Sequence, residues 1–252
     1  MLAIERHRQI LELLSEGGSV RTAEISERFG VTDETVRKDF ELLERRGELR
    51  RIHGGASKLE RVRPDLSFHE RQAVMRAEKQ AIARLAASRI QPGEIIFLDA
   101  SSTALTLTEY LPEVPLTILT NALNVFDALA NRPNLDLMCT GGLYDARSRS
   151  FIGLTAERSL KSFNVHRMFL SGSGLDVGRG VSESNARQAA FKERVVAHAE
   201  DVVFMADHSK LGRKASFFFA ETSDLSCVIT DAAVDPELRG EIESSGLEVL
   251  VA

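Results

Sequence analysis

Short apolar runs alternate with longer amphipathic segments along the second two-thirds of the chain, and this alternation constrains the fold most. The apolar runs are predicted strands and cover residues 95–99, 116–120, 135–140, 166–170, 201–206, 225–230 and 247–251. The predicted helices cover residues 77–90, 103–111, 124–131, 155–163, 184–200 and 235–244. Continuous apolar strands separated by amphipathic helices are typical of a parallel sheet covered on both faces. The predicted fold class is therefore α/β, with a largely parallel sheet.

The N-terminal residues follow a different pattern. Apolar residues at helical spacing predict helices over residues 2–15, 22–29 and 32–46. We expect Thr32 to cap the third helix and Gly47 to end it. An arginine-rich hairpin follows, and this layout of helix, turn, helix and wing places one helix in the major groove of DNA.

We therefore expect three segments. A winged helix-turn-helix domain covers residues 3–58, and an irregular, charge-rich linker around Pro64 covers residues 59–76. An α/β domain for effector binding and oligomerisation covers residues 77–252.

Exposed side chains in the first turns of a recognition helix reach base edges, and cations on the wing suit phosphates. The competing interpretation is an ordinary amphipathic helix with a solvated charged face. The short helix, the glycine turn and the capped helix occur together, which favours DNA binding. The candidate DNA-binding residues are Thr22, Thr32, Thr35, Arg37, Lys38, Arg50, Arg51 and His53.

The formal net charge of −5 is unusual for a protein that binds DNA. The cations are concentrated, however, because residues 45–63 contain seven Lys and Arg side chains and only two acidic ones, Glu48 and Glu60. Contact with the DNA backbone needs such a local cluster rather than an overall positive charge.

Polar loops follow several of the predicted strands. In an open parallel sheet the carboxyl ends of the strands meet at one edge, where ligands bind. Hydroxyls and free N–H groups at a helix start suit phosphate, glycines allow close approach, and a lysine offers a point charge. Any one of these could be a plain loop, but together they predict a pocket. The candidate effector-binding residues are Asp99, Ser101, Ser102, Thr103, Thr120, Asn121, Gly141, Gly142, Ser173, Asp176, Lys192 and Lys210.

Residues 6–56, ending in "HGGA", resemble the N-terminal domain of DeoR-family bacterial transcription regulators. Many members carry two arginines where this chain has Arg37, Lys38 and then Asp39. Residues 79–251 resemble, more loosely, the effector domain of the same family, whose fold is related to ribose-5-phosphate isomerase. Family members usually show D-S-G-T-T where this chain has Ser101 in place of the glycine.

Further matches to the family are Thr120-Asn121, Gly141-Gly142, Gly174-Leu175-Asp176, the D-x-S-K motif ending at Lys210, and Lys192 as the helical lysine. The resemblance implies a repressor of a carbohydrate catabolic operon. It also implies double-stranded operator DNA and a phosphorylated sugar as partners, and a homodimer or homotetramer.

Enzymatic motifs fail in this chain. "GSGLDVG" is one residue too long for a dinucleotide fingerprint, and an isomerase would have only Asp176 as a base, with Val177 where a second acid is expected. We expect no enzymatic activity, no cofactor and no metal site. Two alternatives stay open: a sugar-phosphate enzyme with an accessory DNA-binding domain, and an activator or architectural DNA protein without an effector.

Two further expectations concern the surroundings of the protein. No apolar run approaches the roughly 18 residues of a membrane span, and the charged N-terminus is not a signal peptide, so a cytoplasmic location is expected. Cys139 and Cys227 lie in apolar runs and are expected to be buried, without a disulfide.

Overall fold

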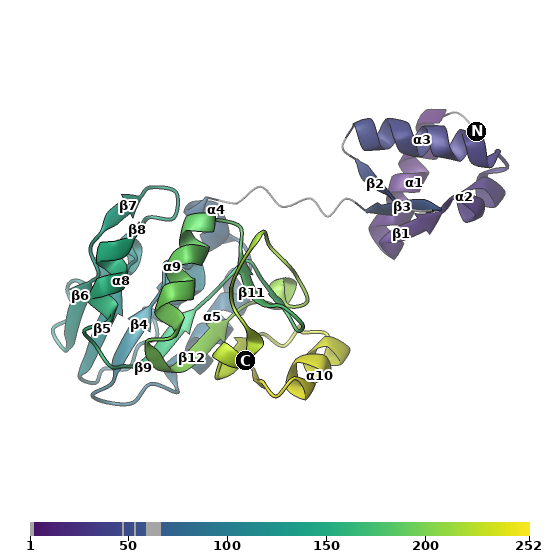
Figure 1. Ribbon diagram of the computed structural model, residues 1–252. Coiled ribbons are helices and arrows are strands. Elements are labelled where there is room, and N and C mark those ends of the chain that lie inside the picture. Colours follow the sequence, from purple (N-terminus) through teal and green to yellow (C-terminus); the bar gives the residue numbers. More distant parts are fainter. Residues whose placement is uncertain (1–2, 47, 53, 59–66) are drawn as a thin grey trace. The chain divides into compact units, whose positions relative to one another are not determined.

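The computed structural model describes residues 3–46, 48–52, 54–58 and 67–252. The chain divides into two compact units, Met1–Pro64 and Asp65–Ala252 (Figure 1). Each unit has a hydrophobic core of its own, so each is described separately.

The first unit contains three helices and a small antiparallel sheet. Its elements are α1 (Ala3–Gly17), β1 (Ser19–Arg21), α2 (Thr22–Phe29), α3 (Asp33–Arg45), β2 (Leu49–Ile52) and β3 (Gly55–Lys58). The strand order is β1-β3-β2, and the β2–β3 hairpin is the expected wing. Gly30 ends α2 in the left-handed conformation with φ of 62°, which glycine adopts without steric cost. The predicted cap Gly47 lies outside the described residues.

The second unit is built on a seven-stranded sheet in which every pair of neighbours is parallel. Its strand order is β15-β14-β12-β9-β4-β5-β6. The strands are β4 (Ile95–Leu98), β5 (Leu116–Thr120), β6 (Leu135–Cys139), β9 (Val165–Leu170), β12 (Ala199–Met205), β14 (Cys227–Thr230) and β15 (Glu248–Val251). All seven correspond to predicted strands, and the predicted α/β class is confirmed.

Helices cover both faces of this sheet (Figure 1). One core joins the sheet to α5 (Arg76–Ala87), α6 (Ser102–Leu107) and α7 (Leu123–Leu129). The other core joins the opposite face to α8 (Leu154–Leu160), α9 (Ala186–Val196) and α10 (Pro236–Ser244). The chain builds outward from β4 to β6 and then returns to β9 on the other side of β4. The loops after β4 and β9 therefore flank the topological switch point, where ligands bind in open α/β sheets.

Several short elements in the second unit were not predicted. They are β7 (Leu143–Asp145), β8 (Ser150–Ile152), β10 (Gly174–Asp176), β11 (Gly180–Glu183), β13 (Phe217–Ala220), two 3-10 turns (His208–Lys210 and Thr222–Asp224) and α4 (Phe68–Ala73). Helix α4 lies within the segment we expected to be an irregular linker. It forms because Ser67 and Glu70 make a reciprocal capping box and because Phe68 is buried.

The two cysteines differ in burial. Cys227 lies on an inner strand, and burial raises the pKa of its thiol to about 11. Cys139 is exposed, contrary to expectation, because β6 is an edge strand with side chains open to solvent on both faces.

Candidate DNA interface and effector site

The start of α3 is organised as the sequence predicts. Thr32 precedes the helix in an extended conformation, and its Oγ1 accepts a hydrogen bond from the Thr35 amide at 3.3 Å. The hydroxyls of Thr32 and Thr35 are 2.9 Å apart. Val36, Phe40 and Leu43 face the core, so the opposite side of the helix is presented to solvent.

That solvent side carries the predicted cations. Arg37 and Lys38 are both exposed, and Lys38 lies 3.8 Å from Glu34 one turn earlier. Arg37 has no ion pair with any residue of the described part of the chain, so its guanidinium is available to a nucleic acid.

The wing carries two more predicted cations. Arg50 and Arg51 are exposed, but Arg51 is also used internally: its Nε is 2.6 Å from Glu44 Oε2 and its amide donates to Glu44 Oε1 at 2.9 Å. This pair holds the wing against α3. Thr22 is buried and begins α2, which leaves little of its side chain for a ligand. His53 lies outside the described residues.

At the carboxyl edge of the large sheet, a buried lysine organises the switch point. Lys192 Nζ lies 2.6 Å from Glu183 Oε1, 3.0 Å from Asp99 Oδ2 and 2.6 Å from the Ser171 carbonyl. Asp99 in turn accepts from the amides of Ser101 and Ser171 at 3.0 and 3.1 Å. These bonds tie together the loops after β4 and β9.

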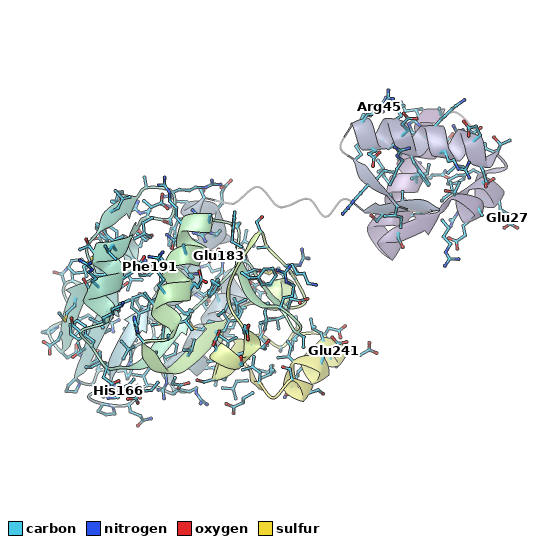
Figure 2. The ribbon with its side chains drawn as sticks, in the orientation of Figure 1. Glu27, Arg45, His166, Glu183, Phe191 and Glu241 are labelled. Atoms are coloured by element: carbon cyan, nitrogen blue, oxygen red, sulfur yellow. The ribbon has the colours of Figure 1, made fainter. Side chains whose placement is uncertain are left out.

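Lys192 is therefore held by residues of its own chain. Burial alone would lower its pKa, but the charges of Asp99 and Glu183 outweigh burial and raise it. Its three N–H donors have three acceptors, so it positions the loops rather than presenting a donor to a ligand. In Figure 2, Glu183 lies at the opposite end of the unit from His166, a residue near the start of β9.

Lys210 is the cation that this arrangement leaves for a ligand. Its Nζ lies 3.4 Å from Ser171 Oγ. The nearest carboxylate among the described residues, that of Asp207, is 4.0 Å away, which is longer than a hydrogen bond. Burial is the main cause that lowers its pKa. Its loop is anchored to the end of β14 by Asp231, which accepts from the His208 amide at 2.7 Å and pairs with the His208 ring at 2.9 Å.

The three hydroxyls after β4 have three different environments. Ser101 is the N-cap of α6, with its Oγ accepting from the Ala104 amide at 3.0 Å. Ser102 Oγ donates to the Arg71 carbonyl at 3.4 Å. Thr103 Oγ1 is buried and has no hydrogen-bond partner among the described residues, so it is the hydroxyl that a ligand could satisfy.

Thr120 uses its hydroxyl for internal hydrogen bonds, whereas Asn121 keeps one acceptor for a ligand. Thr120 Oγ1 donates to the Leu98 carbonyl at 2.7 Å and accepts from the Ala122 amide at 3.0 Å. Asn121 Nδ2 donates to the Phe151 carbonyl at 3.1 Å. Asn121 Oδ1 is buried without a partner among the described residues, which leaves one acceptor for a hydroxyl.

Gly141 and Gly142 allow the chain to fold back into the β7–β8 hairpin. Both have positive φ, and a side chain at Gly142 would lie 2.7 Å from the Ile152 carbonyl. We assign them a backbone role.

The last two candidates lie around β10. Ser173 Oγ donates to Glu183 Oε2 at 3.0 Å. It therefore belongs to the group formed by Lys192, Asp99 and Glu183, called the Lys192 cluster below. Asp176 is at the far end of β10 and pairs with Lys214 at 3.2 Å. The structure therefore does not join Asp176 to the Lys192 cluster, and an isomerase base at this position has no support.

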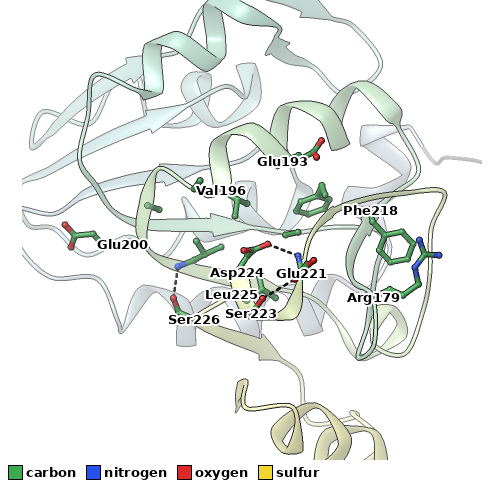
Figure 3. A pocket seen from close by; sticks show the side chains of 15 residues that line it. Arg179, Glu193, Val196, Glu200, Phe218, Glu221, Ser223, Asp224, Leu225 and Ser226 are labelled. Carbon is green, nitrogen blue, oxygen red and sulfur yellow. Dashed lines mark hydrogen bonds between the residues drawn. The ribbon is translucent and has the colours of Figure 1, made fainter.

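Two hollows differ in their fit to an anion. One of about 720 Å³ lies at the amino end of β12 and includes Glu193, Glu200, Glu221 and Asp224 beside a single cation, Arg179 (Figure 3). This excess of negative charge opposes phosphate. The other, of about 530 Å³, has two cations and one carboxylate in its lining, which consists of Asp145, Arg147, Ser184, Asn185, Ala186 and Arg187.

Sequence reasoning missed four residues of this edge: Arg71, Lys79, Glu183 and Asp231. Arg71 and Lys79 precede the first strand of the sheet, so no rule about strand ends points to them. No group of three or more His, Cys, Asp and Glu side chains within residues 3–46, 48–52, 54–58 and 67–252 could hold a metal ion. None of the helices described combines the length and apolar composition that crossing a bilayer requires.

Comparison with known proteins agrees with this arrangement. The DeoR-like helix-turn-helix domain matches residues 6–62, and the DeoR C terminal sensor domain matches residues 74–232. The uncharacterized HTH-type transcriptional regulator YulB of Bacillus subtilis is 39% identical over 99% of this chain and 96% of its own length. The HTH-type transcriptional regulator GlpR of Haloferax volcanii is 34% identical over 99% and 98%. A putative aga operon transcriptional repressor of Escherichia coli O157:H7 is 30% identical over 98% and 93%.

The fold and these matches define a DNA-binding regulator with a helix-turn-helix unit and a sensor domain. The chain belongs to the DeoR family of transcriptional regulators. The resemblance seen in the sequence is thereby confirmed, as is the prediction of a regulator rather than an enzyme.

Proposed function

We propose that this regulator is a repressor of a carbohydrate catabolic operon and that a phosphorylated sugar controls it. In this proposal α3 and the β2–β3 wing bind double-stranded operator DNA. Arg37 reads base edges, while Lys38, Arg50 and Arg51 contact phosphates. The protein acts in the cytoplasm as a homodimer or homotetramer, because repeated half-sites are read by symmetric assemblies.

The observation that carries the effector assignment is the position of Lys210. Its partly exposed ammonium lies beside the switch point of the sheet, and the nearest carboxylate among the described residues, Asp207, is 4.0 Å away. A phosphate would add negative charge there. Two buried atoms without a partner among the described residues would also bond the ligand: the Thr103 hydroxyl would donate to phosphate, and Asn121 Oδ1 would accept from a sugar hydroxyl. The relative that is named a repressor of the aga operon supports a carbohydrate operon as the target.

A thermal-shift screen of phosphorylated sugars against the full-length protein tests the effector. A ligand that binds only the native state stabilises it and therefore raises the melting temperature. At a ligand concentration of one hundred times Kd, the free energy of unfolding rises by about 2.7 kcal/mol. Lys210→Met should abolish the shift and leave DNA binding intact, whereas Lys161→Met, which removes an exposed lysine, should change neither. A screen in which no phosphorylated sugar shifts the wild-type protein would contradict the proposal.

Gel shifts test the DNA interface, with a duplex that the wild-type protein selects from a random library. Arg37→Ala should weaken binding roughly five- to hundredfold, the value of a bidentate base contact. Arg37→Lys should recover part of the loss by charge alone. Unchanged affinity in Arg37→Ala would remove α3 as the recognition helix.

A further inference from the structure

Exposed apolar side chains gather where the large sheet ends at β6. In the described part of the second unit seven large apolar side chains are exposed, and four of them lie between residues 138 and 154. These four are Met138, Leu143, Tyr144 and Leu154, with exposed fractions of 40%, 64%, 44% and 57%. A soluble protein rarely exposes a large contiguous apolar patch, and such a patch marks an interaction surface.

Contacts between neighbouring elements hold β6, the β7–β8 hairpin and α8 together. Tyr144 pairs with Phe151 across the hairpin, with ring centroids 5.6 Å apart. Ser159 Oγ on α8 donates to the carbonyl of Thr140, directly after β6, at 2.8 Å. Figure 1 shows these elements at the same side of the unit. The exposed residues of this region, called the β6 surface below, are Met138, Cys139, Leu143, Tyr144 and Leu154.

The free edge of β6 is not protected against pairing. The strand pairs with β5 on one side, and no strand of the described chain pairs with its other side. Edge strands in soluble proteins usually carry lysine, proline or a bulge that prevents pairing with another chain. The sequence of β6, "LDLMC", has neither lysine nor proline, and its register with β5 shows no bulge. Its outer N–H and C=O groups are therefore open to a further strand.

The charges beside this surface complement one another. Asp136 precedes Met138 by two residues and so lies on the same face of β6, and Arg158 lies one turn after Leu154 on α8. Asp136 and Arg158 are both exposed, and neither forms an ion pair with another residue of the described part of the chain. In a twofold contact the same surface meets itself, so Asp136 of one copy can face Arg158 of the other.

We propose that two copies of this chain associate through the β6 surface, with their β6 strands antiparallel about a twofold axis. This inference rests on the homo-oligomer of the proposed function and names the surface that holds it. Antiparallel pairing satisfies the free backbone groups of both edges. It also removes Met138, Leu143 and Tyr144 from water. The two seven-stranded sheets then join into one through their β6 edges.

Sedimentation equilibrium of the full-length protein over a range of concentrations tests this surface. Leu143→Glu should weaken association roughly thirtyfold or more, the value of a central interface residue, because a charge would be buried without a partner. If the wild-type protein is a tetramer, this variant should be a dimer. The matched control is Val251→Glu, which places the same charge at an exposed apolar position on β15, the opposite edge of the sheet. It should associate like wild type, and circular dichroism should show native secondary structure in both variants.

A charge exchange gives a readout that a folding defect cannot imitate. Asp136→Arg and Arg158→Asp should each weaken association roughly two- to fivefold, the value of a partly exposed pair. The double variant should recover most of the loss, because the pair is restored with its signs exchanged. Losses that add in the double variant would contradict the proposed contact.

Alkylation of the wild-type protein needs no variant. Cys139 is exposed on β6, whereas Cys227 is buried and its pKa is raised to about 11, so a thiol reagent at neutral pH modifies Cys139 selectively. Association should cover Cys139 and slow its alkylation in proportion to the fraction of associated protein. Equal rates in associated and dissociated protein would overturn the inference.

The outcomes separate this surface from the proposed homo-oligomer. If Leu143→Glu associates like the wild-type protein and association leaves the alkylation of Cys139 unchanged, another surface holds the assembly. The inference then fails, and the proposed homo-oligomer stands. If the wild-type protein is a monomer at every concentration and also on operator DNA, both fail.

Discussion

Buried charges define the local structure of both units. In the first unit, Asp39 on α3 lies 2.6 Å from Arg6 Nε and 2.7 Å from the His7 ring, both on α1. Burial alone would raise the pKa of Asp39, but the hydrogen bonds and charges of Arg6 and His7 outweigh it and lower that pKa. The residue next to the exposed Lys38 therefore anchors α3 to α1.

Asp39→Ala should lower the stability of the first unit by about 3 kcal/mol, because it leaves the Arg6 charge buried and unpaired. Glu41→Ala on the same helix breaks an exposed pair with Arg45 and should cost under about 1 kcal/mol. Urea unfolding followed by circular dichroism measures both. The unfolding curve followed by tyrosine emission should be the same in both variants as in the wild-type protein, because the only tyrosines, Tyr110 and Tyr144, lie in the second unit.

The pH dependence of this pair has a definite sign. The pKa of Asp39 is lower in the folded than in the unfolded protein. The stability that the pair adds to the first unit is therefore fully present above the unfolded-state pKa of about 3.9, and it is lost as the pH falls through the folded-state pKa. The acid-induced loss should be smaller in Asp39→Ala. Equal acid sensitivity of the variant and the wild-type protein would contradict the assignment.

The lowered pKa of Lys79 leads us to expect that the protein takes up a proton when an anion binds near this residue. A bound anion favours the charged amine and raises the pKa of Lys79 from about 8. Affinity for sulfate, which does not titrate in this range, should therefore fall as pH rises through about 8. Calorimetry in two buffers of different ionisation enthalpy measures the uptake. It should shrink in Lys79→Met and persist in Lys161→Met, and pH-independent sulfate binding would refute the linkage.

At the scale of elements, the connection from β6 to the β7–β8 hairpin depends on two glycines with different constraints. Gly141 has φ of +63° and open space around an added Cβ. Gly142 has φ of +112°, and an added Cβ would lie 2.7 Å from the Ile152 carbonyl and 3.2 Å from the Ala156 Cβ. A larger residue at position 141 would therefore suffer backbone strain alone. At position 142 it would suffer backbone strain and also overlap with the Ile152 carbonyl.

Gly142→Ala should therefore destabilise the second unit by roughly 3 kcal/mol or more. Gly141→Ala should cost only about 1–2 kcal/mol. Urea unfolding of the full-length protein by circular dichroism compares the two variants. Similar losses in both would mean that the hairpin does not pack closely against Gly142.

At the scale of the whole molecule, the helix-turn-helix domain and the sensor domain lie in separate compact units of the chain. The two units have separate cores, so a response needs an effector that binds the two DNA-affinity states unequally. Such coupling is reciprocal by linkage.

If a sugar phosphate changes DNA affinity by some factor, DNA should change sugar-phosphate affinity by the same factor. Titrating DNA with and without saturating effector, and effector with and without saturating DNA, measures both ratios. The ratios should be equal and differ from one, and Lys210→Met should remove the effect of the sugar phosphate on DNA binding. A ratio of one in wild type would mean that the effector does not regulate DNA binding.

The amino-acid sequence by itself determined the elements of the fold. Apolar runs and helical periodicity are local signals, so they identified the seven parallel strands, the helices covering them and the helix-turn-helix unit with its Thr32 cap. Rules about strand ends also located the edge where Asp99, Asn121 and Lys210 gather. The short antiparallel strands and α4 escaped prediction, because their hydrogen bonds and buried faces come from distant residues.

Only the tertiary structure decided what each charged residue of that edge does. Lys192 forms ion pairs with both Asp99 and Glu183, whereas Lys210 has its nearest carboxylate among the described residues 4.0 Å away. No local pattern could distinguish them, because whether a buried charge is paired depends on side chains brought together from far along the chain. Desolvation makes an unpaired buried charge costly, and so the position of a few carboxylates determines which cations are left for an anion.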